Sequence, residues 1–282
     1  KSDHVLGVHA YKDLLEIPGD VDLAVLIVPA QAIPSVIDQA KEKGVKGLIT
    51  ISAGFKETGH AGAELEILVR DKVREAGIPL IGPNCLGVMN TDPTVKMNAT
   101  FASKMPVEGS LAFISQSGAL CTSVLDFAEA RHQGFSKFVS FGNKADINEV
   151  DLIRYLADDE KTSAIAFYLE DITNGRAFIE AANKVFWEKG KPILVLKSGR
   201  SAEGAKAVSS HTGSLAGSDE VYNALLAQAG ALRGDTIAEL FDYADILTTQ
   251  PLPKGNRLAI ITNAGGPGIM ATDAAIRNGL KL

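Results

Sequence analysis

Short runs of aliphatic and β-branched residues alternate with amphipathic stretches along the whole chain, and this alternation constrains the fold more than any other feature. Strands that alternate with helices are typical of a parallel sheet covered on both faces. The sequence therefore predicts an α/β fold. The expected strands are 23–28, 46–51, 79–81, 110–115, 136–141, 163–169, 192–197 and 257–262, and the expected helices are 31–43, 61–76, 118–132, 148–158, 174–189, 218–229, 236–247 and 267–278.

Two breaks in the alternation suggest three domains. The stretch 83–108 is rich in turn-forming residues and shows little periodicity, and the stretch 248–256 is a Pro-rich connector. The predicted domains are 1–108, 109–250 and 251–282. We expect the first to be incomplete at its N-terminus, because a nucleotide-binding α/β unit normally opens on a Gly-rich turn that this sequence lacks. The third consists of one expected strand, a Gly-rich turn and one helix, and we expect it to be incomplete as well.

Composition and charge exclude several classes of protein. The net charge of −6 and the absence of basic runs argue against a nucleic-acid partner. The apolar runs are shorter than the roughly 20 residues that span a membrane, so no membrane partner is expected. The two cysteines, Cys85 and Cys121, lie far apart, without the spacing of a disulfide framework or a zinc site. We expect a cytoplasmic protein with no metal site of its own.

The sequence ISQSGAL, residues 114–120, joins an expected strand to an expected helix. Ligands collect at such points in parallel sheets, because loops and the positive ends of helix dipoles converge there. The residues Ser115, Gln116, Ser117 and Gly118 therefore form a candidate phosphate site. An ordinary serine N-cap is the alternative reading of the same residues.

Three further turns have the small residues that allow a ligand to approach the backbone. TNAGGPGIM, residues 262–270, resembles the first candidate site and carries Gly265, Gly266 and Gly268. Two such turns suggest one phosphate held between two helix N-termini. The other two turns follow the first two strands and can equally be tight connections without a ligand; they contain Val28, Pro29, Ser52, Ala53 and Gly54.

His211 lies in a segment of small polar residues, 198–217, which predicts a mobile loop. A neutral imidazole on such a loop, near phosphate-binding helix ends, could accept and carry a phosphoryl group. Glu170, at the end of an expected strand, could orient the imidazole, although it could also be an acidic residue at a helix start. A solvated loop histidine is the alternative for His211. His60 opens an acidic amphipathic helix, and we interpret it as a surface residue.

Seven segments in this order resemble the α part of ADP-forming acyl-CoA synthetases, which are related to succinyl-CoA synthetase. They are VPA, ISAGFKE, IGPNCLGVMN, ISQSGAL, SFGNKADIN, YLEDI and SSHTGSLAG. The resemblance covers essentially the whole chain. It implies a Rossmann-like CoA-binding domain followed by flavodoxin-like ligase domains.

The resemblance also implies a reaction and a role for each candidate residue. Acyl-CoA and phosphate would give acyl phosphate and CoA, His211 would take the phosphoryl group, stabilised by Glu170, and ADP would receive it. The two Gly-rich or Ser-rich turns would bind phosphate. Val28, Pro29, Ser52, Ala53 and Gly54 would contact CoA, and Asn84 and Cys85 would lie near its thiol, although Cys85 can equally be a packing residue.

We expect the nucleotide to bind outside this chain, because the sequence has no GxxxxGK[ST] motif. The resemblance implies a β part with an ATP-grasp domain that binds ADP or ATP with Mg, and a hetero- or homo-oligomer. The substrate would be a small carboxylic acid and its acyl-CoA. A regulatory module of a protein acetyltransferase, sensing CoA or acyl-CoA, is the principal alternative. An NAD-dependent dehydrogenase would need a GxGxxG motif, which the sequence lacks.

Overall fold

The computed structural model describes residues 3–212 and 218–282; the side chains of residue 202 and of residues 209–212 lie outside this description. The chain divides into two units, Lys1–Thr248 and Thr249–Leu282. The first unit contains a seven-stranded sheet, a three-stranded sheet and a small hairpin formed by β1 (His4–Val5) and β2 (Val8–His9).

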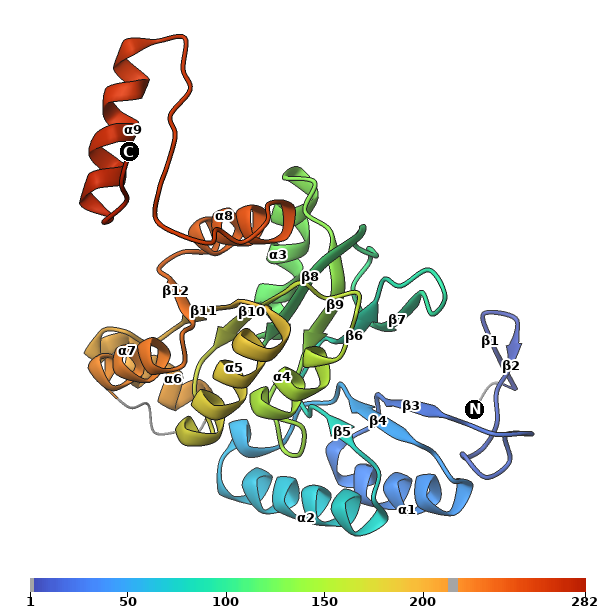
Figure 1. The fold of residues 1–282 in the computed structure, drawn as a ribbon. Coiled ribbons are helices and arrows are strands. Elements are labelled where there is room, and N and C mark those ends of the chain that lie inside the picture. Colours follow the sequence, from blue (N-terminus) through green and yellow to red (C-terminus); the bar gives the residue numbers. More distant parts are fainter. Residues whose placement is uncertain (1–2, 213–217) are drawn as a thin grey trace. The chain divides into compact units, whose positions relative to one another are not determined.

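The seven-stranded sheet forms the centre of the first unit (Figure 1). Its first five strands are parallel to one another, and the last two add to β9 as an antiparallel pair. In spatial order the strands are β12 (Leu232–Gly234), β11 (Ile193–Lys197), β10 (Ala164–Leu169), β8 (Glu108–Ser115), β9 (Phe135–Ser140), β6 (Gly87–Asn90) and β7 (Met97–Thr100).

The strands β6 and β7 correct the prediction that residues 83–108 are irregular. Each has only four residues, too few for a clear alternating pattern. Their stability comes from pairing with a distant strand, in which Val88 lies opposite Val139. Both strands precede residue 108 and yet belong to the larger sheet.

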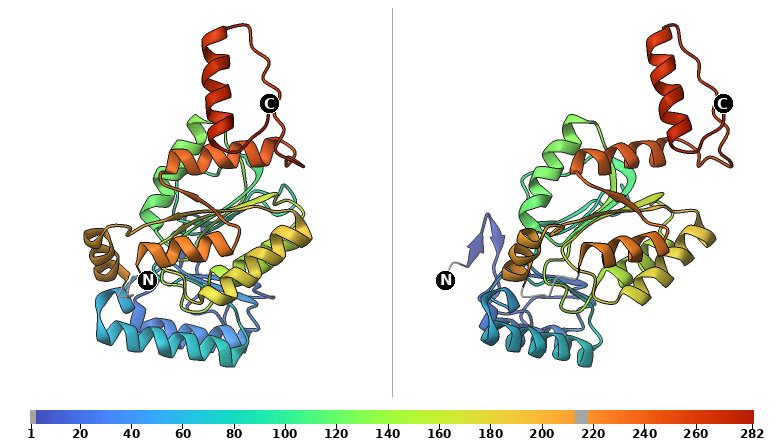
Figure 2. Two further views of the ribbon diagram at one scale, coloured as in Figure 1. Left: turned by 60° about the vertical axis from the view of Figure 1, so that its left-hand side comes forward. Right: turned by 90° about the vertical axis from the view of Figure 1, so that its left-hand side faces the viewer.

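Helices cover both faces of this sheet, as predicted (Figure 2). Successive strand residues alternate between the faces: Leu111 and Phe113 pack with α3 and α8, whereas Ala112 and Ile114 pack with α4, α5 and α7. The helices are α3 (Gly118–Ala130), α4 (Glu149–Ala157), α5 (Gly175–Lys189), α7 (Asp219–Gln228) and α8 (Ile237–Thr249).

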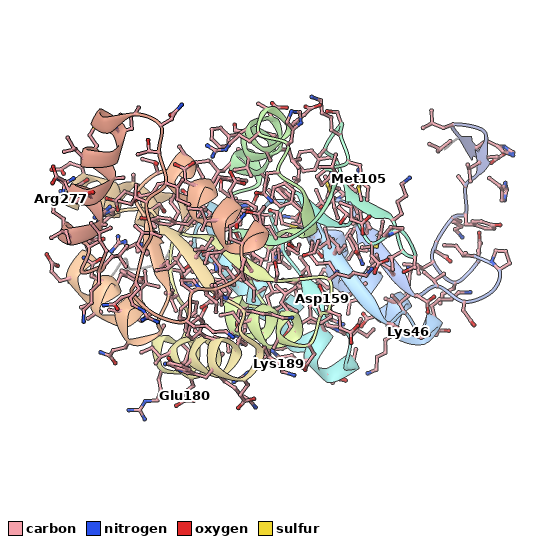
Figure 3. All side chains as sticks on the ribbon, turned by 45° about the horizontal axis from the view of Figure 1, so that its top comes forward. Lys46, Met105, Asp159, Glu180, Lys189 and Arg277 are labelled. Atoms are coloured by element: carbon pink, nitrogen blue, oxygen red, sulfur yellow. The ribbon has the colours of Figure 1, made fainter. Side chains whose placement is uncertain are left out.

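The helix α5 shows the amphipathic pattern from which the helices were predicted. Phe178, Ala181 and Val185 are buried against the sheet. Glu180 and Lys189 lie on the exposed side of the helix (Figure 3). Within the described part of the chain, no helix is long and apolar enough to cross a membrane.

The three-stranded parallel sheet is covered on one face by two helices. Its other face packs through Ile49 against Cys85 and Ala99, from the segment that leads into the larger sheet. The elements of this layer are β3 (Leu23–Leu26), η1 (Ala30–Ala32), α1 (Ile33–Lys43), β4 (Gly47–Thr50), η2 (Lys56–Thr58), α2 (His60–Ala76) and β5 (Leu80–Ile81).

The segment 198–217 is not the loop that the sequence suggested, because most of it forms the helix α6 (Ala202–Thr212). Ser201 accepts a hydrogen bond from the N–H of Gly204 at 3.0 Å, which is the geometry of an N-cap. The alanines that follow have the highest helix propensity of all residues. A serine before an alanine-rich stretch was therefore a helix signal that the small, polar composition concealed.

The second unit contains the helix α9 (Gly265–Arg277). The predicted strand 257–262 is wrong: within the described residues of this unit, only a single bridge joins Arg257 to Lys281. A strand is stabilised by a continuous ladder to a neighbour, and an apolar run does not supply one by itself.

We expect Phe113→Ala to lower the free energy of unfolding by about 3–5 kcal/mol, because it removes a fully buried ring and leaves a cavity. The ring of Phe113 stacks on that of Phe138 with centroids 5.2 Å apart. Chemical denaturation followed by circular dichroism measures the change. Trp187→Ala is the control, because Trp187 is 78% exposed and its loss should cost under about 0.5 kcal/mol. Equal effects of the two substitutions would contradict this core.

Candidate functional site

Parallel pairing brings the carboxyl ends of β8, β9, β10 and β11 to one edge of the larger sheet. Ser115 lies opposite Ser140 in β9 and opposite Tyr168 in β10. Leu169 in turn lies opposite Lys197 in β11. The loops that follow these strands therefore gather the candidate residues Ser115–Gly118 and Glu170 at the same edge.

Ser117 is the N-cap of α3, which the alternative reading of this turn expected, and its role in binding phosphate stays a prediction. Its hydroxyl accepts from the N–H of Leu120 at 3.3 Å. The buried hydroxyl of Ser115 accepts from the N–H of Ser117 at 3.0 Å and donates to its carbonyl at 2.9 Å. The first N–H groups of a helix have no intrahelical acceptor, so this well-ordered N-terminus can hold an anion.

Gln116 uses its side chain to join two strand ends. Its Oε1 accepts from the N–H of Glu170 at 2.6 Å and from that of Asp171 at 3.0 Å, while its Nε2 donates to Asp171 Oδ1 at 2.6 Å. Its backbone N–H donates to the carbonyl of Tyr168 at 3.1 Å. The amide of Gln116 is thus engaged in holding the loop after β10 against the turn before α3.

A buried network of charges lies behind this bridge. Lys144 Nζ is 3.0 Å from Asp171 Oδ1 and 2.9 Å from Glu149 Oε2, and both the Lys144 and the Glu149 side chains are almost fully buried. Glu149 Oε1 accepts from the N–H of Thr173 at 2.6 Å. Burial raises the pKa of Asp171, but the charge of Lys144 and the amide of Gln116 outweigh this, so its pKa lies below the usual value. Asp171 therefore stays ionised near neutral pH.

Glu170 is itself buried, 6% exposed, at the end of β10. Lys197, for which the sequence predicted no role, lies at the end of the adjacent strand and is 2% exposed. Its ammonium stands 4.2 Å from the centre of the Tyr222 ring. Burial lowers the pKa of Lys197 despite the nearby carboxylates. The site thus has a buried cation beside its buried acid.

The turn that contains Asn84 and Cys85 follows a cis Gly82–Pro83 peptide bond. Asn84 adopts a left-handed conformation, with φ of 57°, and its N–H donates to the carbonyl of Ser52 at 3.0 Å. The thiol of Cys85 donates to the carbonyl of Thr50 at 3.3 Å. Burial raises the pKa of this thiol to about 12, so it is protonated at neutral pH.

The predicted CoA-contacting turns lie side by side at the ends of β3 and β4. The hydroxyl of Ser52 donates to the carbonyl of Val28 at 2.6 Å. Gly54 has a φ of 109°, and a Cβ there would stand 3.1 Å from that of Ala30. Pro29 and Ala53 are exposed. These turns therefore leave little space for larger side chains between them and keep an open outer surface.

One cavity of about 460 Å³ joins the two groups of candidate residues. Asn84 and Cys85 line it from the turn beside the three-stranded sheet, and Gln116, Ser117 and Gly118 line it from the start of α3. The remaining lining is Ile51, Phe101, Ala119 and Thr122. A predicted thiol-binding turn and a predicted phosphate site thus share a single cavity, which the sequence could not show.

His211 falls in the last turn of α6, and its side chain lies outside the described residues. The helix α6 packs beside η2, which follows the turn at Gly54. His60 begins α2 and is 89% exposed in its side chain, with Nδ1 3.5 Å from Glu64 Oε1. The interpretation of His60 as a surface residue at a helix start is confirmed.

The Gly-rich turn of the second unit opens α9, where Gly265 is the first helical residue. Before it, the hydroxyl of Thr262 accepts from the N–H of Ala264 at 3.1 Å and donates to its carbonyl at 3.0 Å. This repeats the arrangement of Ser115 with Ser117. Gly266 and Gly268 lie within the first turn, and a Cβ on Gly265 or Gly266 would meet open space.

Among the side chains that the structure describes, no three or more metal-ligating groups lie close enough together to hold a metal ion. The polar groups of the site are hydroxyls, amides, backbone N–H groups and paired charges. These are suited to binding and orienting oxyanions and carbonyl groups.

Comparison with known proteins agrees with this geometry. Residues 1–91 match a family model described as a CoA binding domain, and residues 108–247 match a succinyl-CoA ligase like flavodoxin domain. The chain is 48% identical over 282 residues to the α subunit of ADP-forming acetate–CoA ligase II of Pyrococcus furiosus, which covers 100% of this chain and 60% of the relative. It is 46% identical over 280 residues to the ADP-forming 4-hydroxybutyrate–CoA ligase of Nitrosopumilus maritimus, with 99% and 40% covered.

A solved structure has the same fold. The dinucleotide forming acetyl-coenzyme A synthetase 1 of Ca. Korarchaeum cryptofilum, in complex with phosphate and ADP, matches with a TM-score of 0.92 and 39% identity, covering 100% of this chain and 60% of that one. The chain spans 40–60% of the length of these three proteins. The predicted fold, a CoA-binding domain followed by a flavodoxin-like ligase domain, is confirmed. The chain belongs to the family of ADP-forming acyl-CoA synthetases, and it corresponds to their α part.

Proposed function

We propose that this chain is the α part of an enzyme that interconverts acyl-CoA, phosphate and ADP with a carboxylic acid, CoA and ATP. The observation that carries the proposal is the shared cavity, in which the turn of Asn84 and Cys85 faces the N-terminus of α3. A thioester held at the first and a phosphate held at the second would lie in one cavity. That arrangement favours direct attack of phosphate on the acyl carbon.

In the first step, a phosphate oxygen attacks the thioester carbonyl, the C–S bond breaks, and acyl phosphate and the CoA thiolate form. The capped N-terminus of α3 would bind the phosphate through backbone N–H groups and the helix dipole. The side chain of Gln116 is engaged in its bridge, so its role is to hold Ser117 and Gly118 in place. The protonated Cys85 would take no part as a nucleophile.

In the second step, an imidazole nitrogen of His211 attacks the phosphorus of the acyl phosphate and releases the carboxylate. Glu170 would stabilise the modified histidine by hydrogen bonding the other ring nitrogen. The negative charge of the phosphohistidine would be stabilised by the N–H groups and the dipole of a helix N-terminus. Gly265, Gly266 and Gly268 would form a phosphate-binding turn of their own at the start of α9, and Thr262, which repeats the hydroxyl arrangement of Ser115, supports this role.

In the third step, ADP attacks the phosphohistidine and ATP forms. We assign this step to an ATP-grasp partner, a separate subunit or a fused domain, which would bind the nucleotide and Mg. The name of the Pyrococcus furiosus relative, a subunit α, supports a partner chain. The assembly would be a cytoplasmic oligomer. The substrate class is a small carboxylic acid, because the two relatives above are named for acetate and 4-hydroxybutyrate.

We expect His211→Asn to abolish phosphorylation of the chain. The protein, with its ATP-grasp partner, is incubated with acetyl-CoA and radiolabelled phosphate, and acid-labile label is mapped by mass spectrometry. Loss of the nucleophile should lower labelling by at least about 10³-fold. His60→Asn is the matched control and should label like the wild type, because His60 is exposed at the start of α2. Undiminished label in His211→Asn would contradict the assignment.

We expect Cys85 to be unreactive in the folded protein. With a pKa of about 12, its thiolate fraction at pH 8 is roughly 10³-fold below that of an ordinary thiol, so iodoacetamide should modify it at least that much more slowly. Denaturant should restore ordinary reactivity. Cys85→Ser, which can keep the hydrogen bond to Thr50, should retain histidine labelling. Rapid modification of native protein, or loss of labelling in a folded Cys85→Ser variant, would argue for a nucleophilic role.

A further inference from the structure

Asn143 lies in the loop between β9 and α4 and is 6% exposed. The motifs that suggested the function include this residue but give it no role. Its side chain makes hydrogen bonds to residues from two other parts of the chain, both of which contain predicted CoA contacts. Asn143 is therefore placed to affect the binding of CoA without touching it.

The first set of bonds reaches the three-stranded layer. Asn143 Nδ2 donates to Glu57 Oε2 at 2.6 Å and to Glu66 Oε2 at 2.8 Å. Lys56 Nζ donates to the backbone carbonyl of Asn143 at 2.6 Å and lies 3.4 Å from Glu66 Oε1. One amide thus stands between two carboxylates, and one lysine offsets their charge.

Glu57 also accepts hydrogen bonds from the backbone of the predicted CoA-contacting turn. Its Oε1 accepts from the N–H of Gly54 at 2.6 Å and from that of Phe55 at 3.1 Å. Burial raises the pKa of Glu57, but the bonds from Asn143, Gly54 and Phe55 outweigh this, and its pKa lies below the usual value. The carboxylate is therefore ionised at neutral pH and fixes the turn through both of its oxygens.

The second set of bonds reaches the turn that lines the cavity. Asn84 Nδ2 donates to Asn143 Oδ1 at 3.3 Å, and the N–H of Asn143 donates to the carbonyl of Pro83 at 2.9 Å. The conformation of the loop is tightly defined at this point: Gly142 has a φ of 51°, and a Cβ there would lie 2.3 Å from the carbonyl oxygens of Pro83 and Asn84. The turn and the loop fit closely.

We propose that Asn143 and Glu57 form a positioning pair that sets the turn at Gly54 relative to the turn at Asn84, so that bound CoA presents its thioester to the phosphate site. The inference rests on the proposed function. CoA is a long ligand, and a molecule that contacts two turns binds well only when the distance between them matches its length. Phosphate binds at the start of α3 and does not depend on that distance.

The test uses reciprocal substitutions. Asn143→Asp removes the amide donor and places a third carboxylate against Glu57 and Glu66. Glu57→Gln keeps the acceptor for Gly54 but sets two amide donors against each other when Asn143 is unchanged. In the double variant, the amide of residue 57 can donate to the carboxylate of residue 143, which restores that bond in the opposite sense, while the bond to Glu66 stays lost.

The chain, with its ATP-grasp partner, is assayed for phosphate-dependent release of CoA from acetyl-CoA, and CoA binding is measured by calorimetry. We expect each single variant to raise the KM for acetyl-CoA and the Kd for CoA by about tenfold or more, as lost hydrogen bonds to a charged group predict. The KM for phosphate should stay within about twofold, and the double variant should bind CoA more tightly than Asn143→Asp alone, because the bond to residue 57 is restored. Asn183→Asp, at a partly exposed site on α5 whose amide donates to the carbonyl of Gln228, is the matched control.

Three results would overturn the inference. Unchanged CoA affinity in folded single variants would show that the pair does not position CoA. Equal rises in the KM values for acetyl-CoA and phosphate, with a lowered melting temperature and no recovery in the double variant, would show a purely structural tie. Absence of CoA binding by the wild-type protein would contradict the proposed function, and the inference with it. Should Asn143→Asp fail to fold, Glu57→Gln decides between these results by itself.

Discussion

Parallel pairing of β8 with β9 and β10 aligns the ends of three strands, and the candidate site depends on that alignment. Ser115 stands opposite Ser140 on one side and Tyr168 on the other, so the turn before α3 begins level with the loops after both neighbours. Gln116 then joins its own turn to the loop after β10 through three hydrogen bonds from its side chain. An anion site made of backbone N–H groups needs this support, because a helix N-terminus binds through its geometry and not through a mobile side chain.

Buried charge is the second constraint on this edge of the sheet. Lys144 and Glu149 are buried, and the partly buried Asp171 pairs with Lys144, while Thr173 and Gln116 complete the hydrogen bonds of the two carboxylates. Removing one partner of such a group leaves an uncompensated charge, which typically costs about 3–5 kcal/mol. The network therefore holds the loops after β9 and β10 rigidly. A site that must bring two ligands together benefits from that rigidity, since small displacements reduce the rate steeply.

The layer of the three-stranded sheet and the layer of the seven-stranded sheet meet at the cavity. Asn143 connects the turn at Gly54 with the turn at Asn84. This arrangement gives a physical reason for joining two α/β layers in one chain: each supplies one wall of the cavity and one class of contact. The helix α6 belongs to the same region, because it packs beside η2, which is part of the turn that Glu57 fixes. The residue proposed to carry phosphate is thus on a helix that adjoins the turn predicted to contact CoA.

The sequence by itself determined the α/β alternation, the strands β3, β4, β5, β8, β9, β10 and β11, the capped start of α3 and the family, because these depend on local periodicity, capping residues and short motifs. The tertiary structure decided the rest. The strands β6 and β7 form only by pairing with β9 and with each other, the run 257–262 has no continuous ladder, and α6 replaces an expected loop. The side-chain bridge of Gln116 and the hydrogen bonds of Asn143 had no local signal, because their partners lie more than 50 positions away along the chain. Contacts at such separations follow from packing, which no local pattern encodes.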